Sequence, residues 1–265
     1  MRRSPLVPIL AVLGFAFLYL PIVSLVVFSF NESRLVTVWT GFSFKWYASL
    51  FHDSQIVEAA ILSLQIAAVS ATIATVLGTL AGIALSRLGR FRGKTALTGM
   101  ASAPLVMPDV ITGLSLLLLF VSMEALLGWP AGRGFTTITI AHSTFCMAYV
   151  TVVIRARLSD MDRTLDEAAM DLGATPLRVF FDITLPIIAP ALISGWLLAF
   201  TLSLDDLVIA SFVSGPGSST LPMVIFSKIR LGVSPDVNAL ATIIIAIVAL
   251  GVVGATLIGR RRQKA

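Results

Sequence analysis

The chain has 265 residues, of which 57% are hydrophobic and only 12% are charged. Soluble domains carry roughly a quarter charged residues, so this composition excludes a water-soluble globular protein and indicates a membrane protein. The formal net charge of +5 does not indicate nucleic-acid binding, because the basic residues separate apolar runs and form no basic face. The single cysteine, Cys146, excludes an internal disulfide, and its apolar surroundings favour a small buried hydrophobe.

Six apolar segments are long enough to cross a hydrocarbon core of ~30 Å, which needs about 20 helical residues. We expect these segments at residues 7–30, 57–86, 96–123, 135–154, 186–210 and 238–259. The first lacks a small-residue cleavage site, so we expect it to stay attached, with Arg2-Arg3 before it as an inside anchor. The sequence therefore predicts an all-α polytopic membrane protein with one domain over residues 1–265.

The basic residues predict the orientation of these segments. If the N-terminus is cytoplasmic, fourteen lysines and arginines lie inside and five lie outside, which places both termini in the cytoplasm. The inside set is Arg2, Arg3, Arg87, Arg90, Arg92, Lys94, Arg155, Arg157, Arg163, Arg178, Arg260, Arg261, Arg262 and Lys264. The outside set is Arg34, Lys45, Arg133, Lys228 and Arg230.

The long inside connection, residues 155–185, has the pattern of two short helices. Residues 164–167 read Thr-Leu-Asp-Glu, a capping box that predicts a helix start at Thr164. An apolar stripe follows, and Gly173 then supplies the residue most tolerant of a left-handed helix end. Thr175 is a second N-cap candidate with Pro176 at the first helical position. We therefore expect a helix, a tight bend and another helix on the cytoplasmic surface.

This connection resembles the EAA loop of ABC importer permeases of the six-helix type. The matching positions are Glu167, Ala168, Ala169, Gly173, Ile183, Leu185 and Pro186. The resemblance implies a type I (MetI-like) permease fold in which loop 160–186 docks on a separate cytoplasmic ATPase and transmits ATP-driven closure. An amphipathic helix that merely lies on lipid is the alternative, although it does not account for the glycine and Ile-x-Leu-Pro spacing.

The chain has no ATP site of its own by sequence. Residues 89–95 resemble a phosphate-binding loop, but only three residues separate the glycines where the motif needs four. We therefore expect no enzyme activity in this chain, no catalytic residues, no cofactor and no metal. ATP hydrolysis is assigned to a partner.

Three acidic residues within the predicted apolar segments are candidates for a cation pathway. Asp109 follows Pro104 and Pro108, which are expected to break the third segment, and the pair Asp205 and Asp206 lies in the fifth. No basic residue within these segments offers them a partner, so a cationic cargo is the simplest one. A purely structural role in hydrogen bonding is the alternative. Adjacent helical residues point ~100° apart, so which aspartate faces the pathway stays open.

An aromatic group in the first outside segment adds to this hypothesis. Trp46 has a ring face that attracts alkylammonium groups, although aromatic residues also anchor proteins at membrane interfaces. Three longer stretches resemble the polyamine branch of the permease family, with the putrescine permeases ahead of the spermidine permeases. They are residues 28–31 with 41–47, residues 201–206 continuing through 211–216, and residues 232–242.

The resemblance implies the surroundings of the chain. These are the bacterial inner membrane and its lipid, a second homologous permease, two copies of an ABC ATPase, a periplasmic polyamine-binding protein and a polyamine substrate. A permease for another small cationic or amino-acid-like solute is the alternative. A secondary transporter would have no use for an EAA loop, and a membrane enzyme would need more than the distant His52 and His142 and one cysteine. His142 is interpreted as a packing residue, because no carboxylate is placed beside it by sequence.

Overall fold

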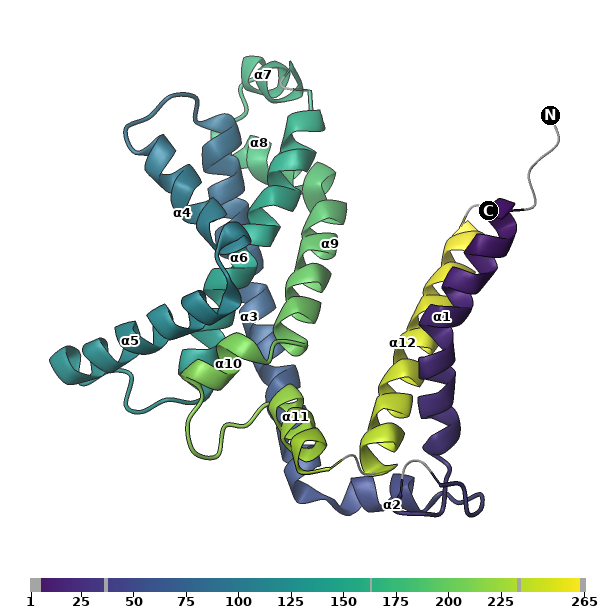
Figure 1. Cartoon of the computed structure of the whole chain (residues 1–265). Coiled ribbons are helices and arrows are strands. Elements are labelled where there is room, and N and C mark those ends of the chain that lie inside the picture. Colours follow the sequence, from purple (N-terminus) through teal and green to yellow (C-terminus); the bar gives the residue numbers. More distant parts are fainter. Residues whose placement is uncertain (1–5, 36–37, 163, 233–234, 263–265) are drawn as a thin grey trace. The chain divides into compact units, whose positions relative to one another are not determined.

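A computed structural model describes residues 6–35, 38–162, 164–232 and 235–262. Arg2, Arg3, Arg163 and Lys264, which the orientation prediction uses, lie outside the described residues. Helices dominate the described part, beside an isolated bridge between Asn31 and Phe42 (Figure 1). The contacts divide the chain into two compact units, residues 1–58 with 224–265 and residues 59–223.

The first unit is built on α1 (Leu6–Phe28), α2 (Lys45–His52) and α12 (Pro235–Arg262), and α12 contacts both α1 and α2. The side chains of α1 are almost all exposed although nearly all are apolar. An apolar helix without a protein partner on most of its surface is suited to hydrocarbon rather than to water.

The second unit is organised around α6 (Phe135–Asp160), which packs against α4 (Lys94–Val106), α9 (Leu185–Leu204) and α10 (Val208–Val213) (Figure 1). Its core combines residues of α6 with apolar side chains of α3 (Ser54–Arg87), α5 (Asp109–Leu127), α9 and α10. Small residues allow close helix contacts: a Cβ added at Gly78 would lie 2.8 Å from Val150 of α6. Polar side chains of α6 are also buried, including His142 at 1% exposure.

The third predicted apolar segment is two helices, α4 and α5, separated at Met107 and Pro108. Met107 is extended (φ −81°, ψ 137°), the conformation imposed on a residue before proline, and Pro108 precedes the first residue of α5. The expected break at Pro108 is therefore confirmed. The expectation that Pro104 also breaks the segment is wrong: Pro104 lies inside α4 near its C-terminal end and does not interrupt it.

The fifth predicted segment ends earlier than expected. Helix α9 stops at Leu204, and a short non-helical stretch precedes α10. The prediction that Asp205 and Asp206 lie within a helix is therefore wrong: they form the junction between two helices. The angular argument that separated them by ~100° does not apply there.

Five helical stretches in the described residues are long and apolar enough to cross a membrane. They are Leu6–Phe28, Ser54–Arg87, Asp109–Leu127, Phe135–Asp160 and the continuous run Pro176–Leu204. A sixth apolar stretch, Pro235–Leu250, is shorter and belongs to α12. The predicted all-α polytopic class is confirmed. After the loop at residues 214–220, α11 (Leu221–Leu231) is a short helix.

Candidate functional sites

The loop that matches the EAA pattern begins with α7 (Thr164–Asp171). The helix start is as predicted, but the acceptor for the amide of Thr164 is Asp162 Oδ1, at 3.0 Å. Hydrogen bonds from the amide and hydroxyl of Thr164 lower the pKa of Asp162 below its ordinary value. The side chain at this helix start is thus that of Asp162, two residues before Thr164, where the capping box was predicted to begin.

Gly173 ends α7 in the left-handed conformation, with φ +88°. Its amide donates to the carbonyl of Met170, and the amide of Ala174 donates to the carbonyl of Ala169. These bonds close the helix end, and any residue with a Cβ would be strained at this position. The predicted bend at Gly173 is confirmed.

The second part of the loop differs from the expectation of a separate helix. Thr175 occupies the N-cap position of α8 (Pro176–Val179) without a side-chain capping bond, and Pro176 is at the first position as predicted. The π-helical turn η1 (Phe180–Thr184) then joins α8 to α9 without a break. Ile183 lies in this turn, and Leu185 and Pro186 begin α9. The loop is therefore joined rigidly to a long apolar helix.

The exposed surface of the loop is partly apolar. Glu167 and Ala168 are exposed, and Ala169 is half-buried. Leu172 is 90% exposed and Leu177 is 73% exposed. Large apolar side chains at such exposure are typical of a surface that another molecule covers.

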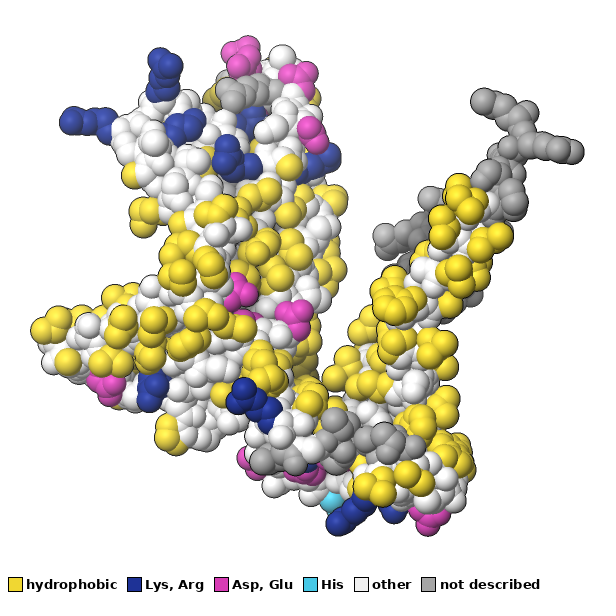
Figure 2. Space-filling model, viewed as in Figure 1, with side chains coloured by type: hydrophobic (Ala, Val, Ile, Leu, Met, Phe, Trp, Pro, Cys, Tyr) yellow, Lys and Arg dark blue, Asp and Glu magenta, His cyan; other side chains and the backbone are white. Residues whose placement is uncertain are grey.

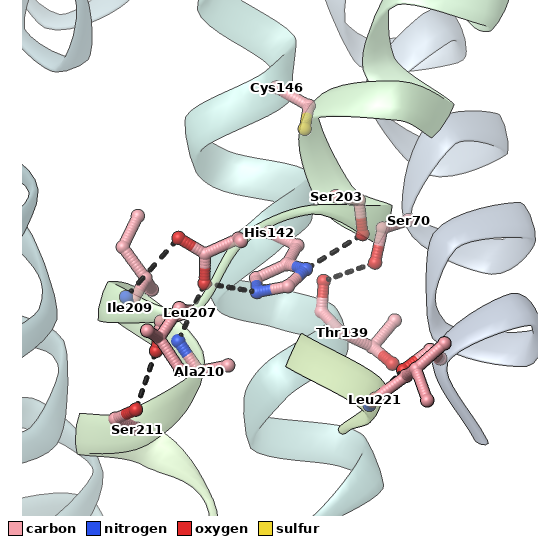
Figure 3. A network of polar contacts seen from close by, with 12 residues as sticks. Ser70, Thr139, His142, Cys146, Ser203, Leu207, Ile209, Ala210, Ser211 and Leu221 are labelled. Atoms are coloured by element: carbon pink, nitrogen blue, oxygen red, sulfur yellow. Dashed lines mark hydrogen bonds and ion pairs between the residues drawn. The ribbon is translucent and has the colours of Figure 1, made fainter. Parts of the chain in front are cut away.

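The second site is a buried polar network between α6 and the α9–α10 junction (Figure 3). His142 Nδ1 lies 2.7 Å from Ser203 Oγ, and its Nε2 lies 3.1 Å from Asp206 Oδ2. Since a carboxylate only accepts, Nε2–H donates to Asp206. Asp206 also accepts the amides of Ile209 and Ala210, at 3.3 and 2.7 Å.

This network corrects two interpretations from the sequence. A carboxylate does lie beside His142, and Asp206 does have a partner within the membrane segments. The packing role of His142 itself is consistent with its hydrogen bonds. The order Ser203–His142–Asp206 resembles a hydrolase triad, but Ser203 is only 5% exposed, which keeps a substrate from its hydroxyl in this structure. The arrangement holds the two helices together.

The remaining acidic candidates differ from Asp206 in their surroundings. Asp205 is the C-cap residue of α9 and is exposed, and Asp109 is exposed in the first turn of α5. Helices α5 and α10 pack on each other, and a Cβ at Gly113 would lie 2.7 Å from the ring of Phe212. The α4–α5 break beside Asp109 and the α9–α10 junction at Asp205 therefore both adjoin the packed pair of helices α5 and α10. Figure 2 shows acidic side chains among apolar ones where α5, α9 and α10 meet.

Cys146 is fully buried, and its Sγ lies 3.4 Å from the carbonyl oxygen of Ala199, as expected for a packing residue. In the part of the chain that the structure describes, no three His, Cys, Asp or Glu residues are grouped so as to hold a metal ion.

Trp46 lies in the first unit, at the start of α2. Its indole Nε1 donates to the carbonyl of Asn31 at 2.7 Å, and Lys45 Nζ lies 4.8 Å from its ring centroid. The ring lines a cavity of about 400 Å³ together with Arg34, Asp53 and other residues. The cation over the ring is thus supplied by the protein itself in this structure.

Lys228 of α11 joins two acidic residues at the same cavity. Its Nζ lies 2.8 Å from Asp53 Oδ2 and 3.0 Å from Asp236 Oδ2. The hydrogen bond from Lys228 lowers the pKa of Asp53, although burial opposes this. Burial alone would lower the pKa of Lys228, but the hydrogen bonds to Asp53 and Asp236 outweigh it, and the pKa is raised.

Comparison with known proteins places these sites in context. Residues 74–263 match the model of the family described as binding-protein-dependent transport system inner membrane component. The chain is 62% identical to the putrescine transport system permease protein PotI of Escherichia coli K12, over 95% of this chain and 89% of that protein. It is 47% identical to the spermidine/putrescine permease protein PotC of Haemophilus influenzae, over 94% of each chain.

Solved structures share the fold at low sequence identity. A bacterial ABC transporter involved in the import of the acidic polysaccharide alginate matches with a TM-score of 0.74 and 20% identity, over 95% of this chain and 92% of that chain. The MetNI methionine ABC transporter in an inward-facing conformation matches with a TM-score of 0.62 and 16% identity, over 76% of this chain and 92% of that chain. These likenesses concern the fold alone.

Proposed function

Because the chain belongs to the family of binding-protein-dependent transport system inner membrane components, we propose that it is the permease subunit of an ATP-driven importer for polyamines, with putrescine as its substrate. One observation carries the choice of substrate. Identity is 62% to a putrescine permease and 47% to a spermidine/putrescine permease, at nearly equal coverage. Membership of the family and several long apolar helices make the chain a multi-pass inner-membrane protein.

The proposal assigns α7 and the bend at Gly173 to coupling with the ATPase. Glu167, Ala168 and the exposed Leu172 offer a surface on which a partner can pack, and Ala169 keeps the helix narrow. Because α8, η1 and α9 are continuous, a displacement of the loop moves the N-terminal end of an apolar helix. The residues assigned to this role are Glu167, Ala168, Ala169, Gly173, Ile183, Leu185 and Pro186.

The proposal assigns the cation pathway to Asp205 and Asp109. Asp205 is exposed beside a helix break, where backbone groups as well as a carboxylate are open to a passing ammonium group. Asp206 is the anchor of the same junction, since two amides and His142 already engage it. Trp46 is assigned to the outer end of the cation pathway, where the ammonium group of Lys45 already lies over its ring.

The complex proposed for this chain contains a second homologous permease, two ATPase copies and a periplasmic polyamine-binding protein. Both termini are proposed to be cytoplasmic, which places α7 on the ATPase side and α2 on the receptor side. A chain with one set of apolar helices supplies half of a pathway, so a second permease is needed to enclose a charged cargo. The exposed apolar helices of this chain are open to such a neighbour or to lipid.

The decisive experiment is uptake by the reconstituted complex of labelled putrescine, spermidine and amino acids, with and without ATP. We expect ATP-dependent uptake of putrescine that exceeds spermidine uptake and does not occur for neutral amino acids. Asp109→Asn and Asp205→Asn are expected to lower putrescine uptake several-fold while receptor affinity persists. Equal or better transport of an amino acid would move the substrate to the alternative class of small amino-acid-like solutes.

A further inference from the structure

One ion pair joins the coupling loop to a helix that is remote from it in sequence. Arg87, the last residue of α3, places Nη1 3.4 Å from Asp166 Oδ2 in the first turn of α7. The two side chains are only 16% and 19% exposed. The positions suit both helices, because a cation is favoured at a helix C-terminus and an anion at an N-terminus.

The carboxylate of Asp166 connects a third element. Its other oxygen, Oδ1, lies 3.4 Å from the hydroxyl of Thr184, which is buried at the end of η1. The ends of α3, α7 and the η1–α9 run therefore meet at one side chain. Asp166 is half-buried at this meeting point, whereas the next residue, Glu167, is exposed.

Beside the Arg87–Asp166 pair, helix α7 is not held in position by close apolar packing. A cavity of about 420 Å³ lies beside the pair, lined by Ile83, Met170 and Phe180 among others, together with Arg87 and Asp166. Within the described residues, Nε and Nη2 of Arg87 are also buried without a hydrogen-bond partner. A helix beside an open cavity depends on its polar link for its orientation.

We propose that Arg87 and Asp166 are positioning residues that hold the coupling helix α7 in its docking orientation and carry its displacement to α3. The inference rests on the proposed function, because it concerns how that importer is coupled. The ion pair would transmit a displacement of α7 to α3, in addition to the covalent connection of the loop to α9. The N–H groups of Arg87 that have no partner here permit a bidentate hydrogen bond to Asp166 when α7 shifts.

The test compares Arg87→Gln and Asp166→Asn with the charge swap Arg87→Asp/Asp166→Arg in the assembled complex. Two quantities are measured: hydrogen exchange of the α7 amides, and putrescine imported per ATP hydrolysed with loaded receptor. We expect both single variants to exchange roughly five-fold faster in α7, as for loss of one partly buried ion pair. Import per ATP should fall several-fold, and the swap should move both values back toward those of the parent.

Two controls match the perturbation. Arg178→Gln removes an exposed ion pair with Asp182 in the same loop and should leave α7 exchange unchanged. Arg90→Gln removes a positive charge from an exposed side chain just beyond α3 and should leave import per ATP unchanged.

The outcomes separate this inference from the proposed function. Unchanged exchange in both single variants, or a swap no better than the singles, overturns the link. Faster exchange with unchanged import per ATP overturns the positioning role. If the parent complex does not import putrescine, the proposed substrate is wrong. The exchange data and the receptor-stimulated ATPase then still decide whether Arg87 and Asp166 orient α7.

Discussion

Asp205 and Asp206 are adjacent but differ in their surroundings, because only Asp206 belongs to the buried hydrogen-bond network. We therefore predict that replacing each by Asn has different consequences. Asp206 has a side chain 9% exposed and accepts three hydrogen bonds, from His142 Nε2 and the amides of Ile209 and Ala210. Asn at this position has one acceptor oxygen and turns an NH₂ group toward donors. At least one buried donor is left without a partner.

The expected magnitude follows from the number of donors left unpaired. One unsatisfied buried donor costs about 1–3 kcal/mol, so Asp206→Asn should destabilise by about 2 kcal/mol. Asp206→Ala removes the acceptor for all three donors and should cost at least about 3 kcal/mol. In soluble domains of this size, about 2 kcal/mol corresponds to a midpoint shift of roughly 4–8 °C.

Asp205→Asn is the matched control, because it makes the same chemical change at the neighbouring exposed side chain. Its effect on stability should stay within about 0.5 kcal/mol. The assay heats the purified complex in detergent and measures the fraction that stays monodisperse, alongside putrescine uptake at a permissive temperature. The reasoning is refuted if Asp206→Asn is as stable as the parent, or if Asp205→Asn is the less stable of the two.

The remaining predictions concern the other sites. Gly173→Val should leave the subunit inserted but abolish coupling, because φ +88° strains a β-branched residue; full uptake in membranes containing normal amounts of the variant would contradict this. Trp46→Leu should weaken uptake at low putrescine more than at saturation, whereas Trp46→Phe, which keeps a ring, should lose less; equal uptake curves would remove Trp46 from the path. The lowered pKa of Asp53 means that its link to Lys228 stabilises the fold above the ordinary carboxyl range and is lost as the pH falls through the lowered pKa. The raised pKa of Lys228 keeps the same link intact until the pH rises above the ordinary lysine range. Lys228→Met should therefore lower thermal stability evenly between these limits and remove the acid transition, and a parent-like pH profile of stability would contradict the link.

Local patterns predicted much of the fold. Long apolar runs identified the membrane helices, and the helix start at Thr164 and bend at Gly173 follow from capping and glycine preferences. The break at Pro108 was also predictable, because proline restricts the residue before it. The helix start, the bend and the break each depend on residues within about one helical turn, and an apolar run is continuous along the chain, so a sequence shows all of them directly.

The α9–α10 junction was missed because its segment, Leu202 to Leu207, contains no proline or glycine. A signal was nevertheless present. Aspartate is a preferred acceptor for amides at a helix start, and Asp206 lies three and four residues before the amides that it caps. An acidic pair inside an apolar run therefore indicates a helix restart as well as a cargo site.

Contacts between distant residues were beyond local patterns. His142 and Asp206 are 64 residues apart, and Arg87 is still further from Asp166. Which carboxylate meets which base depends on the rotation of each helix about its axis. That rotation is set by packing, such as the close approach at Gly78 and Gly113, and no single segment specifies it.

Helix dipoles provide an independent argument for Asp205 as the cargo residue. Asp109 and Asp206 both lie at helix starts, where a negative charge stabilises the partial positive charge of the N-terminus. Local structure therefore gives each of them a reason to be acidic. Asp205 is instead the C-cap of α9, where a carboxylate is repelled by the negative end of the helix. The helix end therefore does not favour this charge, and under the proposed function a passing diammonium ion offsets its cost. The loss of uptake should accordingly be greater in Asp205→Asn than in Asp109→Asn, and the reverse order would assign the cargo contact to the α4–α5 break.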